Sequence, residues 1–249
     1  MKPSDDMKNP IPLLLTGSIA IEKYNVFQTV LVDTQVRLNQ YIDSIEYAIV
    51  KYNNINHIIF CENTNFEYDY SELVSKAYKR GKTLEIIRFT GDYKNIQRKG
   101  KGYGEGEIVK YAIENSEILN SSLCFIKLTG RVLVKNMDKC IETTKNETAF
   151  LFGPPHSKKN FVQTIIYKVN TKFYYNVLLN VYFQVNDPEG YCLEHAFYEA
   201  LKKYPIKSFG RYPDLDGTSG SVGYSYLMPR KEYLKATVYN MIGFYNNKI

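Results

Sequence analysis

The sequence has few cysteines, and they are not arranged as in a metal or redox site. Four cysteines occur in 249 residues, Cys61, Cys124, Cys140 and Cys192, and none belongs to a CxxC pair or to a Cys/His cluster with zinc spacing. Cys61 and Cys124 lie in apolar runs that are typical of buried strands. Because isolated thiols of this kind behave as small hydrophobic side chains, we expect free cysteines and a reducing compartment.

Long apolar runs and blocks of basic residues are also missing. The apolar stretch 11–21 is broken by Pro12 and by the Thr-Gly-Ser segment 16–18, which is typical of neither a signal peptide nor a membrane span. The 32 basic and 26 acidic residues, a net charge of +6, are spread along the chain. We therefore predict a cytoplasmic protein without a nucleic-acid partner, whose charge suits a phosphate-bearing ligand or an anionic membrane surface.

The composition that remains is that of an ordinary globular protein. Hydrophobic residues make up 44% of the chain and charged residues 23%. The length is sufficient for one domain with a sizeable core. We expect this domain over residues 11–225, followed by a basic and aromatic helix over 226–249. That C-terminal segment is our candidate for peripheral contact with the inner face of the membrane.

Strands and helices alternate over the first half of the chain. Short apolar runs predict strands at 11–19, 57–61, 84–89 and 123–128, and periodic apolar positions predict helices at 33–52, 70–80 and 105–115. This alternation predicts an α/β fold with a mostly parallel central sheet flanked by helices. A polar loop is expected at 90–104. Beyond residue 128 we expect β-rich runs at 161–169 and 174–183, a helix at 193–203 and a turn-rich loop at 211–223.

Ligands of open α/β sheets bind beyond the carboxyl ends of the strands. The loops that follow the predicted strands should therefore converge on one crevice. Outside the glycine-rich segment, these loops supply the candidate site residues Thr16, Gly17, Glu62, Asn63, Thr129, Gly130 and Arg131.

The segment 98–106 places four glycines next to lysines and ahead of a predicted helix. Glycines let backbone amides approach a phosphate, and a helix N-terminus adds partial positive charge. The spacing matches neither a Walker motif nor a dinucleotide fingerprint, so a surface loop without a ligand is the alternative. As an anion-binding loop, the segment contributes Lys101, Gly102, Tyr103, Gly104 and Glu105.

Lys127 lies inside an apolar strand and Arg131 lies just beyond its end. A lysine in a buried strand needs a partner, and one interpretation is a structural ion pair with Glu105 or Glu107. The other is a cationic clamp on a diphosphate leaving group, with Arg131 as the bidentate member.

Acidic residues in the second half of the chain are candidates for acid–base chemistry. Glu194 and His195 begin a predicted helix, where Glu194 could serve as a general base and His195 could orient a substrate. An acidic residue favoured by the helix dipole is the simpler interpretation. Asp138 and Asp216 are reserve bases. The Asp214-Leu-Asp216 segment suits Mg²⁺ or Mn²⁺, although aspartate is common in turns. From this loop we select Asp216, Thr218, Ser219 and Ser221 as acceptor- or phosphate-binding residues.

In their order along the chain, these motifs resemble small bacterial glycosyltransferases of the GT-A type from capsule and lipopolysaccharide biosynthesis. The resemblance covers roughly residues 11–225 and rests on the segments 15–18, 60–63, 100–105, 125–131, 194–198 and 217–221. It implies a GT-A-like, Rossmann-like fold. It also implies a nucleotide-sugar donor held by the N-terminal half and a saccharide or glycolipid acceptor held by the C-terminal half.

One departure from that family concerns metal ions. Enzymes of this type have an Asp-x-Asp metal motif at the end of the strand that here reads Lys-Leu-Thr-Gly-Arg, from 127 to 131. We therefore predict that no cofactor is required, with a divalent Mg²⁺ or Mn²⁺ ion as the alternative. We also predict an inverting displacement.

Two rival functions stay open. One is another nucleotide-dependent transferase, such as a phospho- or nucleotidyltransferase, and the other is a non-catalytic RNA- or membrane-binding module.

Overall fold

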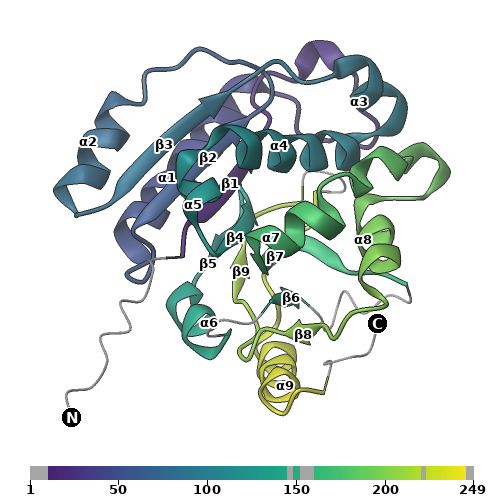
Figure 1. Cartoon of the computed structure of the whole chain (residues 1–249). Helices are drawn as coiled ribbons and strands as arrows, with labels where there is room; N and C mark the ends of the chain where they lie inside the picture. Colours follow the sequence, from purple (N-terminus) through teal and green to yellow (C-terminus); the bar gives the residue numbers. More distant parts are fainter. Residues whose placement is uncertain (1–10, 145–147, 152–159, 220–222, 245–249) are drawn as a thin grey trace.

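The structure is a computed structural model that describes residues 11–144, 148–151, 160–219 and 223–244 (Figure 1). Within these residues, a seven-stranded sheet has the order β3-β2-β1-β4-β7-β6-β8. Its strands are β1 (Leu13–Gly17), β2 (His57–Glu62), β3 (Thr83–Arg88), β4 (Cys124–Thr129), β6 (Ala149–Leu151), β7 (Gln163–Asn170) and β8 (Lys207–Ser208). All pairings are parallel except those of β7 with β4 and β6. The predicted α/β fold with a mostly parallel sheet is confirmed.

Helices cover both faces of this sheet. On one face lie α1 (Thr34–Lys51) and α2 (Ser71–Lys79), and on the other lies α4 (Lys101–Asn115) (Figure 1). The side chains of the central strand β1 explain why both faces are covered. Leu13 and Leu15 pack into the core cluster beneath α1, whereas Leu14 packs into the cluster beneath α4. Because β1 is buried on both faces, its sequence is a continuous apolar run rather than an alternating one.

The predicted helix boundaries at α1 and α2 have clear local causes. The Asp33 side chain accepts a hydrogen bond from the Val36 backbone N–H at 2.7 Å and caps α1. Gly81 follows α2 with a φ of 69°, a left-handed conformation that glycine adopts at little cost.

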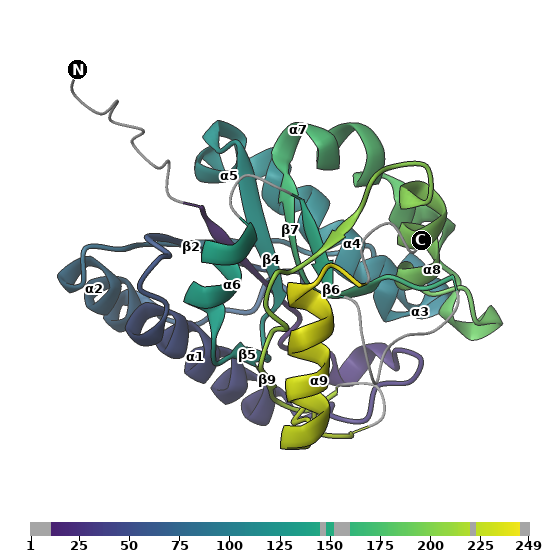
Figure 2. The same ribbon diagram turned by 90° about the horizontal axis from the view of Figure 1, so that it is seen from below.

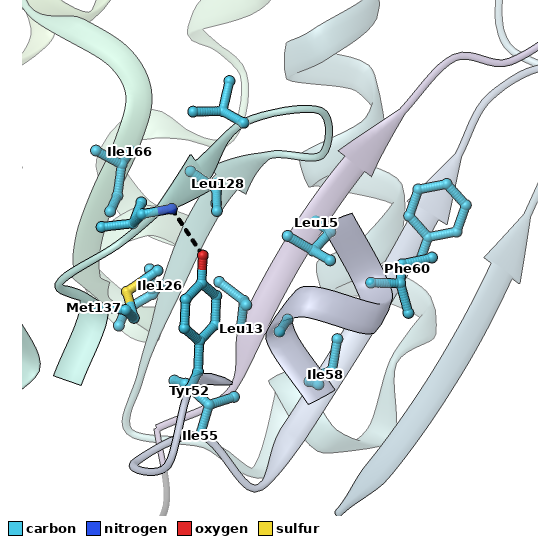
Figure 3. Packing of buried hydrophobic residues seen from close by; sticks show 14 of the residues in the cluster. Leu13, Leu15, Tyr52, Ile55, Ile58, Phe60, Ile126, Leu128, Met137 and Ile166 are labelled. Atoms are coloured by element: carbon cyan, nitrogen blue, oxygen red, sulfur yellow. Dashed lines mark hydrogen bonds between the residues drawn. The ribbon is translucent and has the colours of Figure 1, made fainter. Parts of the chain in front are cut away.

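A short second sheet next to α1 pairs two strands that lie far apart in the sequence. It pairs β5 (Leu133–Val134) antiparallel with β9 (Leu215–Asp216). The Tyr52 hydroxyl, at the end of α1, accepts a hydrogen bond from the Val134 N–H at 2.8 Å (Figure 3). Around it pack Leu13, Ile126, Leu128, Met137 and Ile166 (Figure 3). Burial raises the pKa of Tyr52, so this phenol stays a neutral hydrogen-bonding group.

Two predictions of local structure are wrong. The segment 90–104 contains α3 (Tyr93–Lys99) and the start of α4, and is not a loop. The run 174–183 is also helical, with a π-helix at Tyr174–Leu178 and a 3-10 helix at Val181–Gln184, instead of a strand. Asn170 ends β7 and caps this helical stretch by accepting a hydrogen bond from the Phe173 N–H at 2.9 Å. Tertiary packing of the buried Tyr174 against Phe125 and Phe197 outweighs its β propensity.

The remaining helices belong mostly to the second half of the chain. They are α5 (Glu117–Ser121), α6 (Met137–Thr144), the single turn α7 (Thr171–Phe173), α8 (Leu193–Leu201) and α9 (Arg230–Met241). Ala236 of α9 is part of the core cluster beneath α1. Within the described residues, no helix combines the length and the apolar content needed to cross a bilayer.

Candidate functional site

A cavity of about 490 Å³ lies at the carboxyl ends of β1, β2 and β4. The first residues of β7 reach the same edge because β7 runs antiparallel to β4. Of the site residues predicted from the sequence, the cavity is lined by Thr16, Gly17, Asn63, Lys101, Gly104, Glu105, Thr129, Arg131, Glu194, His195 and Ser219. The structure thus brings side chains from both halves of the chain together, as expected for a ligand crevice of an open sheet.

Other predicted residues do not line this cavity. They are Glu62, Gly102, Tyr103, Lys127, Gly130, Asp216 and Thr218. Ser221 lies outside the described residues. Gly130 instead allows β1 and β4 to approach: its N–H donates to the Thr16 carbonyl at 2.9 Å, and a Cβ on Gly130 would come within 2.6 Å of that oxygen.

Glu62 organises the loop after β2 and does not face a ligand. Its side chain is fully buried. One carboxylate oxygen accepts hydrogen bonds from the Thr64 N–H and hydroxyl at 2.8 and 2.6 Å, and the other accepts from the Phe66 N–H at 2.7 Å. Burial raises the pKa of Glu62, while these donors oppose the shift.

The glycine-rich segment binds an anion that belongs to the protein itself. Gly100 begins α4 with a φ of 97°, and the Gly102 N–H donates to the Asp187 Oδ2 at 2.9 Å. A Cβ on Gly100 would come within 2.3 Å of the same oxygen, so glycine is required there. The anion chemistry predicted for this segment is therefore present, but a carboxylate occupies the helix N-terminus. A donor phosphate cannot bind the Gly102 amide while Asp187 holds it.

Tyr103 is buried in this helix and packs away from the cavity. Its ring contacts Tyr182 edge-on, with the centroids 4.9 Å apart, and the Lys99 Nζ lies 5.3 Å from its centroid. Gly106, one turn later, leaves room for the same tyrosine, because a Cβ there would come within 2.1 Å of the Tyr182 Cβ. This part of the glycine pattern serves helix packing.

Lys127 forms a structural ion pair, which is one of the two interpretations of its position in the sequence. Its side chain is fully buried and forms an ion pair with Glu105. The other Nζ donors reach the Thr129 hydroxyl at 3.1 Å and the Thr164 carbonyl at 2.7 Å. Because the three N–H groups of an ammonium then have three acceptors, Lys127 has no donor left for a diphosphate.

Two arginines bring positive charge to the cavity without an ion-pair partner among the described residues. Arg37 of α1 and Arg131 both lie against the Tyr41 ring, with guanidinium carbons 6.0 and 5.9 Å from its centroid. Among the described residues, neither has a carboxylate within 4.0 Å. Burial lowers the pKa of Arg37, and the nearby charge of Arg131 acts in the same direction. We call these two residues the arginine pair.

The members of the arginine pair are held differently. Arg37 is buried and donates from Nε to the Ser18 carbonyl at 2.7 Å and from Nη1 to the Leu31 carbonyl at 2.9 Å. Arg131 donates from Nη1 to the Gln40 Oε1 at 2.9 Å, and its buried Nε has no partner. Arg37 therefore fixes the loop after β1, whereas Arg131 keeps donors for a ligand.

Three carboxylates, Glu105, Asp187 and Glu194, gather at the same cavity, and we call them the acidic cluster. Burial raises the pKa of Asp187, and the charges of Glu194 and Glu105 add to the shift, while the Gly102 N–H and Lys101 oppose it. The Asp187 Oδ1 is buried without a hydrogen-bond partner. Lys101, beside Asp187, has no carboxylate within 4.0 Å among the described residues.

Glu194 is positioned by β7 and its own helix. It lies in the first turn of α8 and accepts a hydrogen bond from the Thr164 hydroxyl at 2.8 Å. The neighbouring His195 Nδ1 lies 3.2 Å from the Cys192 Sγ. Burial raises the pKa of Cys192 to about 12, and Glu194 adds to the shift, so the thiol stays protonated.

An uncharged region of the cavity follows β2 and β3. The Ser18 hydroxyl donates to the Asn63 Oδ1 at 2.6 Å, and the Tyr93 hydroxyl donates to the Asn63 carbonyl. The Tyr93 ring stacks on Tyr24, with centroids 3.4 Å apart and planes 5° apart. Ile96 completes this region. An aromatic ring of this kind is a flat surface on which a nucleobase can stack.

The reserve bases lie elsewhere. Asp138 accepts hydrogen bonds from the Asn53 and Asn54 N–H groups at 3.1 and 2.9 Å, next to the start of β2, at the other end of the sheet. Asp216 pairs with the Lys135 Nζ at 2.9 Å in the second sheet. In the described part of the chain, no three His, Cys, Asp or Glu side chains come together as a metal site.

Several cavity residues were not predicted from the sequence. They include Ser18, Arg37, Tyr41, Tyr93, Thr164 and Asp187. A signal existed for Arg37, because a charged side chain shares the buried face of the predicted amphipathic helix with Leu38 and Tyr41. Asp187 had no such signal: in the segment Asp187-Pro-Glu-Gly it is indistinguishable from an ordinary turn residue.

No protein-family model and no curated protein sequence matches this chain. Solved structures that are similar to it include WbbM, a bifunctional glycosyltransferase in its apo form, with 9% identity and a TM-score of 0.43. That match covers 80% of this chain and 38% of WbbM, so the chain spans well under half of that protein. Another is the nucleoside-diphosphate-sugar pyrophosphorylase from Vibrio cholerae RC9, with 12% identity, a TM-score of 0.45 and coverages of 92% and 100%.

Proposed function

We propose that this protein transfers a sugar from a nucleotide-activated donor to a saccharide or glycolipid acceptor. The supporting observation is that one cavity at the carboxyl edge of the sheet holds both an unpaired Arg131 and a hydrogen-bonded Glu194. Sugar transfer needs a cation where the diphosphate leaves and a base where the acceptor hydroxyl loses its proton.

The donor's diphosphate is assigned to Arg131 and Lys101. Arg131 has a buried Nε without a partner, and an arginine can bind a phosphate through two parallel N–H groups. Lys101 lines the cavity and adds a point charge. The nucleoside is assigned to the stacked Tyr93 and Asn63 of the uncharged region and to Thr16, which lines the same cavity.

Glu194 is assigned as the general base of an inverting displacement. It accepts the proton of the acceptor hydroxyl as that oxygen bonds to the anomeric carbon, and the bond from this carbon to the diphosphate oxygen breaks. The electron pair of that bond stays on the leaving nucleoside diphosphate, where Arg131 and Lys101 stabilise the negative charge. His195 and Ser219 line the same cavity and are assigned to acceptor binding.

The basic side chains are proposed to replace a divalent ion at the leaving phosphate. Arg131, just after β4, and Lys101, at the start of α4, both line the cavity to which the diphosphate is assigned. Full turnover in excess EDTA supports this assignment. Complete loss of turnover that Mn²⁺ restores removes it and makes the protein a metal-dependent transferase.

A donor screen tests the proposal directly. The wild-type melting temperature is measured with UDP, GDP, CMP and dTDP sugars, and the stabilising donor is then incubated with saccharide acceptors. The proposal expects free nucleotide together with a glycosylated acceptor. Release of pyrophosphate or transfer of a phosphoryl or nucleotidyl group would instead assign the cavity to another nucleotide-dependent transferase.

A further inference from the structure

The last helix is apolar on the side that faces away from the core. Ala236, Thr237 and Asn240 of α9 are buried against the domain. Leu234, Val238, Met241 and Ile242 are exposed by 53 to 68%. The spacing places Leu234, Val238 and Met241 along one exposed face of α9, beside the buried one, and Ile242 directly follows the helix. We call these four residues the α9 stripe.

An exposed stripe of this kind is unusual for a surface helix. Such a helix is normally polar on the side away from the core, because that side stays in water. A contiguous exposed apolar surface usually marks a contact with a partner or a membrane. In Figure 2, α9 lies on the outside of the molecule, in front of the sheet. The α9 stripe is therefore a candidate docking surface.

Basic residues beside the α9 stripe identify the chemistry of that occupant. Arg230, Lys231 and Lys235 are exposed, and Glu232 is the only acidic residue of the helix. Lys231 and Lys235 each lie three residues before a member of the stripe, so they are on the same side of α9. Aliphatic side chains that enter the acyl region and lysines that meet anionic headgroups are the two attractions of an interfacial helix.

A second copy of this chain fits the same surface less well. Two α9 stripes packed face to face in parallel would bring Lys231 and Lys235 of one copy close to those of the other, and in antiparallel packing these lysines would find no acidic side chain of α9 at the Met241 end. Like charges across an interface oppose association, whereas an anionic lipid surface attracts them. Charge complementarity therefore favours the bilayer over self-association.

The docking surface is linked to the cavity by a short segment. Tyr224 and Tyr226 line the cavity, and α9 begins at Arg230, four residues later. We propose that the α9 stripe docks on an anionic lipid bilayer and thereby presents the cavity to a lipid-linked saccharide acceptor. The second half of this inference rests on the proposed sugar transfer. The docking itself does not.

Vesicle binding by the full-length protein tests the docking. Wild-type protein is sedimented with vesicles of phosphatidylglycerol and phosphatidylethanolamine, and with phosphatidylcholine vesicles. We expect binding to the anionic vesicles that weakens with salt. The double variant Leu234→Ser/Val238→Ser and the charge reversal Lys231→Glu/Lys235→Glu should each weaken it by about tenfold or more. Leu123→Ser, which changes a leucine 68% exposed at the start of β4, is the matched control and should bind as wild type.

The outcomes separate docking from sugar transfer. Variants in the α9 stripe should keep wild-type melting temperatures and wild-type transfer to a soluble acceptor. Equal binding of wild type and stripe variants, or no preference for anionic vesicles, overturns the docking proposal. A dimer that the variants dissociate, without vesicle binding, overturns it in favour of a second copy. Vesicle binding without transfer to any acceptor leaves docking intact and refutes only the proposed function.

Discussion

The arginine pair and the acidic cluster face the same cavity, yet their charges are satisfied differently. Asp187 accepts a hydrogen bond from the start of α4, and Glu105 is paired with the buried Lys127. Arg37 and Arg131 have no carboxylate partner in the described part of the chain, and Arg131 keeps an unbonded Nε. Glu105 of the acidic cluster is thus neutralised by Lys127, whereas the arginine pair has no anionic partner among the described residues. The free Nε of Arg131 is consistent with the anionic ligand proposed above.

The largest expected effect concerns Glu194, the member of the acidic cluster that accepts a hydrogen bond from the Thr164 hydroxyl. Glu194→Gln keeps an acceptor for the Thr164 hydroxyl but cannot take a proton. We expect the turnover number to fall by about 10²–10⁴-fold, with donor affinity within a few fold of wild type. Steady-state kinetics and donor titration measure both quantities. Glu199→Gln, on the same helix and paired with Lys202 at the surface, is the control. Full activity of Glu194→Gln would exclude it as the base.

Next in size is the loss of Arg131. Arg131→Met removes the cation assigned to the leaving phosphate, and we expect kcat/KM to fall by about 10²-fold. Arg131→Lys should restore part of this loss, because lysine supplies the charge but not the planar fork. Arg80→Met, at the exposed end of α2, should leave the kinetics unchanged. If Arg131→Met and Arg80→Met behave alike, Arg131 does not bind the donor.

The Lys127–Glu105 ion pair should affect stability more than donor recognition. Glu105→Gln leaves a fully buried ammonium without its counter-charge, and we expect a loss of about 3 kcal/mol in the free energy of unfolding. The double variant Lys127→Met/Glu105→Gln removes both charges and should recover most of that loss. Urea unfolding of wild type, single and double variants forms the test. A double variant less stable than Glu105→Gln would contradict the assignment of a structural pair.

The smallest effect is the pH dependence of Asp187. Its pKa is raised by burial, so the folded state favours the protonated form more than the unfolded state does. The stabilisation of the folded state by the protonated Asp187 is complete below the ordinary pKa of 3.8. It is lost as the pH rises through the pKa of Asp187 in the folded state. Asp187→Asn keeps an acceptor for the Gly102 N–H. It should therefore gain stability over wild type at pH 7, by less than about 1 kcal/mol, and lose this gain near pH 4.

A second aspartate provides the opposite sign as a control. Hydrogen bonds from Ser71 lower the pKa of the exposed Asp69, so its contribution is present at neutral pH and lost as the pH falls. Asp69→Asn should thus be less stable than wild type at pH 7 and approach it in acid. Urea unfolding across the pH range compares the two variants. If both variants changed the stability at pH 7 in the same direction, the environments assigned to Asp187 and Asp69 would be refuted.

The parts of the fold that follow from local patterns were predictable from the sequence. The buried strands and the boundaries of α1 and α2 depend on apolar periodicity, Asp33 and Gly81, all visible in the chain. The sequence predicts a loop up to residue 104, because the start of α4 depends on partners far along the chain. Asp187 and Tyr182 fill the space that Gly100 and Gly106 leave open, and a sequence does not show such contacts.

The same limit applies to the site. Positions at strand ends identified Thr16, Asn63, Thr129 and Arg131 as cavity residues, since parallel strands end at one edge. Whether a charge faces the cavity or is satisfied internally depends on its partners across the sheet. For that reason Lys127 could be interpreted as a clamp or as an ion pair, and the contact with Glu105 decides between them.

The most direct test of sugar transfer is a product balance. Wild-type protein, a stabilising nucleotide sugar and a saccharide acceptor are incubated, and free nucleotide and glycosylated acceptor are quantified by mass spectrometry. We predict one glycosylated acceptor for each nucleotide released, with both products lost together in Glu194→Gln. Intact donor across the panel, or nucleotide release without a glycosylated acceptor, would contradict the proposed function.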